Sequence, residues 1–307
     1  MSVRLSAFAA SIRLANFPSV WCNAFTGVGL LFLTKSEGDL NQAATLPLLL
    51  CVTCLYGSGN LLNDWWDRGW DCIHRPERAL PQQVFTPWFY LVASVALGAS
   101  GFGFAWIASP QTSVAACVIL VAILVYTLLH KKSSLACIAM AFCRGALPWL
   151  GLLATSSHPS TWPMTVVCAV ALFSLALFIH TLSISLSSRI CPPIQEGPPA
   201  IGVALMTGVF AASTAVASAC LLPCFQWFFS FAALPYIAAI ALSVSVPYRQ
   251  NPHRRVSWLL ACFPLLDAVV LIPLSNLLQY PEATACLILP PVCFVVARWL
   301  QRSIPAT

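Results

Sequence analysis

Three long stretches of the sequence contain no Asp, Glu, Lys or Arg at all. They cover residues 79–130, 145–188 and 197–248. A helix that crosses a bilayer needs about 20 apolar residues, so each stretch is long enough for two crossings. Only 8% of the chain is charged, whereas a soluble domain carries roughly a quarter. The pattern excludes a soluble enzyme, a nucleic-acid-binding protein and a disordered chain, and it predicts an all-α polytopic membrane protein.

Apolar windows separated by polar or proline-containing breaks predict ten membrane segments. They cover roughly residues 15–34, 43–62, 86–107, 113–130, 134–155, 163–184, 198–221, 225–246, 257–278 and 283–300. The first apolar run is too long for the core of a signal peptide, so we expect a retained helix. No stretch is left for a second, soluble domain, and residues 1–307 are therefore predicted to form one transmembrane domain.

The basic residues predict how these segments are oriented. With ten segments, thirteen of the fifteen Lys and Arg residues fall on one side; the exceptions are Lys35 and Arg144. The positive-inside rule makes that side cytoplasmic, so both termini are expected in the cytoplasm and the number of crossings is even. We expect a multi-pass protein of the cell inner membrane. The net charge of +6 then reflects topology rather than a nucleic-acid partner.

The fourteen cysteines are scattered through apolar runs, where cysteine behaves as a small hydrophobic residue. Cys51 and Cys54 form a CxxC pair inside a predicted membrane helix. A metal-binding or redox role for this pair is the alternative to simple packing, but that motif indicates such a role mainly in a soluble context.

A polar constellation follows the second predicted segment. Asn63, Asp67 and Asp71 are spaced by four residues, which places them within an arc of about 80° on one helix face. Asp64 lies beside them. Carboxylates stacked at the end of a membrane helix repel one another, and a divalent cation would neutralise them. Oxygen ligands suit Mg²⁺, which often shares its coordination sphere with substrate phosphates.

A simpler interpretation of the same residues is a solvated helix end, with Asp67 and Asp71 paired to Arg68 and Arg75. Two further charges lie within predicted membrane segments. Arg144 needs a partner at that depth, either Asp67 or a bound anion, and Asp267 needs one that the sequence does not reveal.

The constellation resembles the first aspartate-rich motif, NxxxDxxxD, of the UbiA superfamily of intramembrane prenyltransferases. The stretch Arg75-Pro-Glu-Arg78-Ala-Leu80-Pro81 is similar to the basic segment that follows that motif. Arg13-Leu14 ahead of Pro18 resembles the family's opening. Tyr126 followed by Lys131 resembles its YxxxK element, with one extra residue between the two.

Two further stretches resemble the EboC-like branch of this family, namely Met140-x-x-Cys143-Arg144-Gly145 and Leu265-Leu-Asp267-Ala268. The resemblance implies a bundle of nine to ten transmembrane helices around a central cavity, with its charged mouth in the cytoplasm. The implied reaction transfers a prenyl group from a polyprenyl diphosphate to an acceptor, which the sequence does not identify. No obligate protein partner is indicated.

The resemblance also assigns roles to residues. Mg²⁺ would be held by Asn63, Asp64, Asp67 and Asp71, with Asp67 and Asp71 catalytic because the metal they hold neutralises the departing diphosphate. The predicted diphosphate ligands are Arg75, Arg78, Lys131 and Arg144, since guanidinium and ammonium groups bind phosphate oxygens. For Arg75 and Lys131, a role limited to positive-inside topology is the alternative.

The chain departs from the family at the second acidic motif. The matching stretch, residues 178–189, contains no Asp or Glu. His180 is our candidate proton acceptor there, and Ser183 and Tyr126 are candidate cavity residues, although a membrane serine commonly bonds its own helix backbone. The chain is thus expected to be a prenyltransferase. The alternatives are an isoprenoid cyclase and a non-catalytic protein that binds or transports an isoprenoid lipid.

Overall fold

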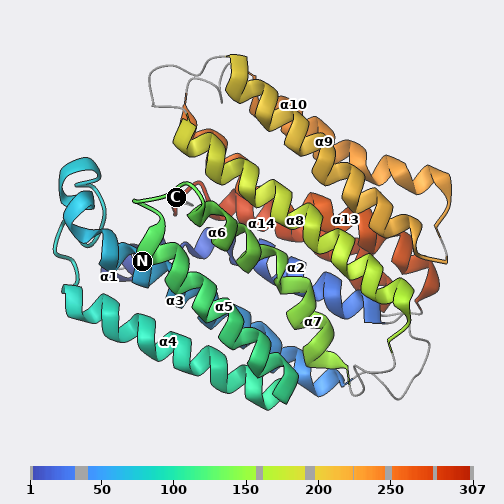
Figure 1. The fold of residues 1–307 in the computed structure, drawn as a ribbon, viewed down its shortest axis with the longest axis horizontal. Helices are drawn as coiled ribbons and strands as arrows, with labels where there is room; N and C mark the ends of the chain where they lie inside the picture. The colour runs from blue at the N-terminus through green and yellow to red at the C-terminus, as the bar shows by residue number, and fades with distance from the viewer. Residues whose placement is uncertain are drawn as a thin grey trace.

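The fold was analysed in a computed structural model (Figure 1). It describes residues 3–31, 41–156, 162–190, 198–223, 225–245, 251–278 and 282–304. The first half of the described chain forms α1 (Val3–Ser11), α2 (Phe17–Leu31), α3 (Thr45–His74), α4 (Pro87–Ala108), α5 (Pro110–Leu129), α6 (Ala136–Gly145) and α7 (Leu147–Thr155). The second half forms α8 (Met164–Ile190), α9 (Pro198–Cys220), α10 (Leu234–Ser243), α12 (Pro252–Ala261), α13 (Phe263–Leu274) and α14 (Glu282–Leu300).

Short 3-10 segments connect several of these helices. They are η1 (Leu14–Asn16), η3 (Gln42–Ala44), η5 (Trp227–Ala233) and η6 (Ser275–Leu277). Proline sets where several helices begin, because its fixed φ suits the first turn and its missing N–H is not needed there. Thr86 and Ser109 cap α4 and α5 by accepting hydrogen bonds from Phe89 N and Thr112 N.

The prediction of an all-helical membrane protein is confirmed. Among the described residues, seven helical stretches are long and apolar enough to cross a membrane, and α6–α7 and α12–α13 each count as one of them. Two shorter apolar helices cover Ala204–Cys220 and Trp227–Ser243. Each of the ten predicted segments overlaps helical residues, but the predicted count of nine to ten crossings is not confirmed.

The outward faces of α4 and α5 are apolar. Their exposed side chains include Val92, Val95, Trp106, Val118 and Val121, which a soluble protein would bury. A surface of this kind matches a lipid environment. In Figure 1, α4 lies along one edge of the bundle and α9 and α10 along the opposite edge, with α2 between them.

The centre of the bundle is a close contact between α2 and α7. A Cβ added to Gly27 would overlap the carbonyl of Pro148, and one added to Gly151 would overlap the carbonyl of Ala24. Only glycine lets two helix backbones approach this closely, as in other membrane helix pairs. The contact joins the two halves of the apolar core, because α2 packs against α3 on one side and against α13 on the other.

Both described ends of the chain lie at one end of the bundle. Ser6 of α1 and Gln301, just after α14, line the same cavity as the loop that follows α3. This agrees with the prediction that both termini lie on the same side. Which side of the membrane they face remains a prediction.

Candidate functional site

Helix α3 carries the predicted carboxylates well beyond the apolar segment. The sequence predicted a span ending near residue 62, whereas α3 continues to His74. Asp64, Asp67 and Asp71 therefore lie on its last three turns, and they are only 7%, 6% and 2% exposed. Ionised carboxylates that are this buried require compensating charge.

Two arginines from separate segments supply charge to Asp64. Arg13 Nη2 and Arg78 Nη1 each lie 3.2 Å from Asp64 Oδ1. Arg78 Nη1 also lies 2.8 Å from Asp71 Oδ2, so one guanidinium bridges two carboxylates. Arg13 is held in place by a second contact, because its Nη1 donates to Asn60 Oδ1 at 2.8 Å.

The backbone of Arg13 is strained in a way that fits this role. Its φ of 54° and ψ of 50° are in the left-handed region, which few non-glycine residues occupy. Such conformations persist only where surrounding contacts hold them, and they gather at functional sites. Here the conformation ends α1 and lets the side chain reach Asn60 and Asp64 on α3.

Asp67 contacts a histidine and a lysine from the turn between α5 and α6. His130 Nε2 lies 2.9 Å from Asp67 Oδ2, and Lys131 Nζ lies 3.6 Å from the same oxygen. His130 Nδ1 lies 2.9 Å from the carbonyl oxygen of Thr127. The ring is thus held between the Asp67 carboxylate and the Thr127 carbonyl.

Trp70 gathers several polar side chains beside this face. Lys131 Nζ lies 3.7 Å from its ring centroid, the guanidinium carbon of Arg75 lies at 5.9 Å, and the ring of His74 stacks on it at 4.1 Å. A cation over an indole face is attracted by the ring quadrupole. Trp70 was not singled out from the sequence, although its position three residues after Asp67 was a usable signal.

The solvated-end interpretation of the motif is wrong in its pairing. Arg68 donates to the carbonyl of Trp65 rather than to a carboxylate. Within the described residues, Arg75 has no carboxylate oxygen within 4.0 Å, and Asp71 pairs with Arg78 instead.

The donor chemistry of the α3 face fits Mg²⁺, although no group of three His, Cys, Asp or Glu side chains in the described part of the chain is already arranged around one point. Asn63 Oδ1 is buried and accepts no hydrogen bond from any described residue, while Asn63 Nδ2 lies 3.4 Å from Asp67 Oδ2. A buried oxygen without a donor is costly unless something binds it. Asn63 and Asp67 thus offer hard oxygen ligands side by side.

Arg144 lies away from these carboxylates. It is 8% exposed, its Nη2 donates to Ser19 Oγ at 2.5 Å, and its guanidinium carbon lies 3.9 Å from the ring centroid of Phe263. Of the two partners that the sequence left open for Arg144, Asp67 instead contacts His130 and Lys131, and a bound anion stays a prediction. Arg144 Nε has no hydrogen-bond partner within the described residues.

The buried carboxylate whose partner the sequence did not reveal is satisfied by α2. Asp267 Oδ2 accepts from Asn23 Nδ2 at 2.7 Å, and its Oδ1 accepts from Thr26 Oγ1 at 2.5 Å. Asp267 is fully buried. These bonds join α13 to α2 and give Asp267 a structural role in the bundle centre.

His180 also has internal partners for both nitrogens. Its Nε2 lies 3.0 Å from the carbonyl oxygen of Leu259, which only accepts, and Tyr236 Oη lies 2.8 Å from Nδ1. The ring therefore donates from Nε2 and accepts from the Tyr236 hydroxyl at Nδ1. Ser183 Oγ accepts from Thr207 Oγ1 at 2.5 Å. These bonds place neither His180 nor Ser183 beside the α3 carboxylates, whereas Tyr126 stacks on His130 with ring centroids 5.1 Å apart.

The stretch that corresponds to the family's second acidic motif lies in α8. The side chains of residues 178–186 are described, whereas the side chains of residues 187–190 lie outside the described set. The described part contains no carboxylate, as the sequence requires.

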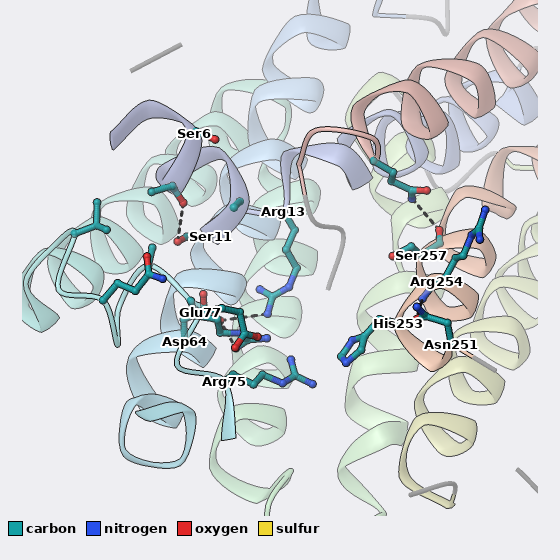
Figure 2. A pocket seen from close by; sticks show the side chains of 17 residues that line it. Ser6, Ser11, Arg13, Asp64, Arg75, Glu77, Asn251, His253, Arg254 and Ser257 are labelled. Atoms are coloured by element: carbon teal, nitrogen blue, oxygen red, sulfur yellow. Dashed lines mark hydrogen bonds and ion pairs between the residues drawn. The ribbon is translucent and has the colours of Figure 1, made fainter. Parts of the chain in front are cut away.

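A cleft of about 910 Å³ opens beside the carboxylate face (Figure 2). Its walls come from α1, the loop after α3 and the start of α12. The lining includes several charged or titratable residues, namely Arg13, Asp64, Arg75, Glu77, Arg78, His253 and Arg254, among small and polar ones. Of the residues predicted from the sequence, Asp64, Arg75 and Arg78 line this cleft.

The chain is similar to known proteins in both sequence and fold. Residues 22–187 match the model of the UbiA prenyltransferase family. Digeranylgeranylglyceryl phosphate synthase from Thermococcus kodakarensis is 33% identical over 129 residues, which are 41% of this chain and 47% of that protein. The synthase from Methanothrix thermoacetophila is 29% identical over 141 residues, 45% of this chain and 53% of that protein.

Protoheme IX farnesyltransferase from Aeromonas salmonicida is 28% identical over 160 residues, 50% of this chain and 53% of that protein. The chain thus spans about half the length of the curated relatives it matches.

Two solved structures share the fold over most of the chain. One, from work on digeranylgeranylglyceryl phosphate synthase in membranes, has a TM-score of 0.60 at 17% identity and covers 93% of this chain and 99% of that one. The other is the apo structure of a UbiA homologue from Aeropyrum pernix, with a TM-score of 0.62 at 16% identity, covering 83% and 97%. Because the family model matches more than half of its residues, this chain belongs to the UbiA prenyltransferase family.

Proposed function

We propose that this chain transfers a prenyl group from a polyprenyl diphosphate to an acceptor at the charged end of the bundle. One observation carries the proposal, namely that three buried carboxylates on α3 meet cations from three other segments. Those segments are the α1–η1 junction, the loop after α3 and the α5–α6 turn. The gathered basic residues favour a cytoplasmic location for this end, in the inner membrane of a cell.

Mg²⁺ is the proposed metal, and Asn63, Asp67 and Asp71 are its proposed ligands. Asp64 is the weakest candidate among the predicted ligands, because Arg13 and Arg78 both bind its Oδ1. We infer that Asp64 instead positions these two arginines. When bound, Mg²⁺ supplies charge neutralisation on the departing diphosphate.

Arg78 and Lys131 are the proposed diphosphate ligands closest to the carboxylates. Without substrate they neutralise Asp71 and Asp67, and with substrate they are available to bind phosphate oxygens. Trp70 and His130 hold Lys131 and Asp67 in place for this exchange. Arg144, which lies deeper in the bundle, is not needed for this part of the site.

The reaction balances without a redox partner. The bond between C1 of the prenyl chain and the diphosphate oxygen breaks, and its electron pair leaves with the diphosphate. A nucleophilic atom of the acceptor forms the new bond to C1, and the proton that it loses passes to the departing diphosphate. The apolar bundle keeps water away from the carbocation-like prenyl group during this step.

A second candidate function is a protein that binds isoprenoid diphosphates without transferring them, or that cyclises them. The described part of the second motif contains no carboxylate, and the internal bonds of His180 leave it without a free nitrogen. A site with one acidic face would still bind a diphosphate.

The test measures diphosphate release from farnesyl and geranylgeranyl diphosphate by the purified protein, with and without Mg²⁺. Asp67→Asn and Asp71→Asn are each expected to lower release by about 100-fold or more, because each removes a ligand of the metal that neutralises the departing diphosphate. Each factor of ten corresponds to about 1.36 kcal/mol of lost transition-state stabilisation. Glu282→Gln, which changes an acid in the first turn of α14, is the matched control and should retain release.

The outcomes separate the candidates. Release that is unaffected by Asp67→Asn would contradict the proposal. Binding without release would indicate a carrier, and release with a cyclic hydrocarbon or alcohol as the product would indicate a cyclase. Mass spectrometry of lipids that copurify with wild type, but not with Asp67→Asn, would identify the bound isoprenoid.

A further inference from the structure

Helix α3 is longer than the hydrocarbon part of a bilayer is thick. It contains 30 residues, which at 1.5 Å per residue make a length of about 45 Å. The hydrocarbon core is about 30 Å thick, and a bilayer with its headgroups about 40–45 Å. A helix of this length that starts at the far membrane surface reaches through the headgroup layer at the charged end of the bundle.

The last turns of α3 have two nearly opposite faces. At 100° per residue, the three carboxylates lie within an arc of about 60°, and Trp66, Gly69 and Ile73 lie within a second such arc across the helix. The carboxylates are buried, whereas Ile73 is 77% exposed and Trp66 is also exposed. No heavy atom lies within 4 Å of a Cβ added to Gly69. An inward charged face and an outward apolar face are the reverse of a soluble helix, so the surroundings of this outer face are apolar.

Neighbouring segments at the same end expose large apolar side chains as well. The first turn of α4 lies at this end, because Tyr90 Oη lies 2.6 Å from Ser11 Oγ of α1. Trp88 in that turn is exposed, and so is Leu135, just after the turn that follows α5. Exposed tryptophans at a helix end are typical of the boundary between headgroups and acyl chains.

Cations flank the outer face of α3. Around the helix axis, Arg68 and Trp70 lie on its two sides. Lys131 Nζ lies 3.7 Å from the ring centroid of Trp70, and the next residue, Lys132, is exposed. In the part of the chain that the structure describes, no carboxylate oxygen lies within 4.0 Å of a nitrogen of Arg68 or Lys132. Both side chains therefore present unbalanced positive charge beside an apolar face.

We propose that this outer face binds an anionic phospholipid of the leaflet at the charged end. The glycerol and upper acyl chains lie against Trp66 and Ile73, and the phosphate lies near Arg68 and Lys132. Helices with this combination of an apolar face and flanking basic residues bind at the headgroup boundary. An anionic lipid is favoured over a zwitterionic one because its phosphate has no choline beside it to offset the attraction.

The test is native mass spectrometry of the full-length protein in neutral detergent, titrated with phosphatidylglycerol or phosphatidylcholine. Wild type should bind its first phosphatidylglycerol at least about fivefold more tightly than phosphatidylcholine. Arg68→Gln and Lys132→Gln should each weaken phosphatidylglycerol binding by about fivefold, the contribution of one basic residue near an anionic lipid surface. Arg302→Gln removes an exposed arginine that follows α14. It is the matched control and should leave this affinity unchanged.

A second pair of variants tests the apolar contact. Ile73→Ser should weaken binding of both lipids, because the outer face then offers less apolar surface. Ile107→Ser is the matched control, since Ile107 is 67% exposed and lies near the opposite end of α4. It should leave the first phosphatidylglycerol bound as in wild type. Thermal melting of each variant checks that it is folded.

Several results would overturn the proposal. Equal affinity of wild type for the two lipids would do so, as would an unchanged affinity for phosphatidylglycerol in Ile73→Ser. Equal losses in Arg68→Gln and Arg302→Gln would indicate attraction to net charge alone. Wild-type dimers that Ile73→Ser converts to monomers, without a preference for phosphatidylglycerol, would assign the face to a second copy of the chain.

This lipid site is separate from the proposed catalytic function. Arg68 and Ile73 make no contact with the α3 carboxylates among the described residues, so Arg68→Gln and Ile73→Ser should keep diphosphate release in detergent without added lipid. If Asp67→Asn leaves release intact, the proposed function fails whether or not phosphatidylglycerol binds. If phosphatidylglycerol shows no preference, the lipid site fails while diphosphate release is unaffected.

Discussion

The Nε2 atom of His130 lies 2.9 Å from Oδ2 of Asp67, although 63 residues separate the two in the sequence. Both side chains are buried, at 7% and 6% exposure. The contact joins the end of α5 to the last turns of α3, and it brings Lys131 to the same carboxylate. It therefore fixes the relative position of the proposed metal ligand and one proposed diphosphate ligand.

Removing either side chain of this contact should destabilise the protein. His130→Gln removes the ring nitrogen that contacts the buried Asp67 and leaves Lys131 as its cation, and we expect a loss of about 1–3 kcal/mol, less than the roughly 3–5 kcal/mol of a fully orphaned buried ion. Asp67→Asn should cost a similar amount. The measurement is the free energy of unfolding of the purified protein in detergent, obtained from denaturant titrations.

The double variant decides whether the two residues act as a pair. The double variant Asp67→Asn with His130→Gln should lose at least about 0.5 kcal/mol less stability than the two single variants lose together, because each single variant already breaks the same contact. Additive losses would contradict a direct ion pair. Glu282→Gln combined with His130→Gln is the control, and its losses should add.

Trp70 should act by positioning Lys131 rather than by contacting the substrate. Trp70→Leu removes the indole face 3.7 Å from Lys131 Nζ, and a cation–π contact of about 0.5–2 kcal/mol corresponds to a 2- to 30-fold effect. We expect the KM for the prenyl diphosphate to rise by that factor with a smaller change in kcat. Trp70→Phe keeps a weaker ring face and should recover part of the loss.

Trp66 provides the control for this prediction. It is 42% exposed, close to the 40% of Trp70, and lies on the same helix, but no cation lies over its ring in the described residues. Trp66→Leu should leave the KM unchanged. An equal rise in both variants would point to a general loss of helix packing at the membrane surface.

Much of this architecture could be predicted from the sequence. Uncharged runs long enough for two crossings predicted the helical bundle, and the four-residue spacing of Asn63, Asp67 and Asp71 predicted a shared face on α3. Both inferences depend only on local periodicity and on the cost of burying charge. The structure confirms that the carboxylates lie together on a buried helix face.

The partners of these residues could not be predicted, because they depend on how helices pack. Nothing local to Asp64 or Asp67 indicates that Arg13 or His130 will face it. The cleft has the same origin, since His253 reaches it only through the position of α12 beside α1 and the loop after α3. For the same reason, the sequence could not show that His180 bonds to Tyr236.

The His180–Tyr236 contact should support stability more than catalysis. Tyr236→Phe removes the donor to Nδ1 and leaves that buried nitrogen without a hydrogen bond, which costs about 1–3 kcal/mol. We expect a lower melting temperature, with diphosphate release per folded molecule close to wild type at low temperature. A large fall in kcat at unchanged stability would instead restore the hypothesis that His180 accepts a proton.

The contact between α2 and α7 gives the sharpest prediction about stability. Gly151→Ala places a methyl group on the carbonyl of Ala24, and the two backbones must separate to accommodate it. Overpacking of this kind costs typically about 1–3 kcal/mol, and more is expected here because the obstacle is backbone. Gly103→Ala on α4 is the matched control, since nothing lies within 4 Å of its added Cβ. It should be neutral or stabilising by up to about 1 kcal/mol, because alanine favours a helix over glycine. Thermal melting of both variants in the same detergent checks the prediction, and equal melting temperatures would contradict the close approach of the two helices.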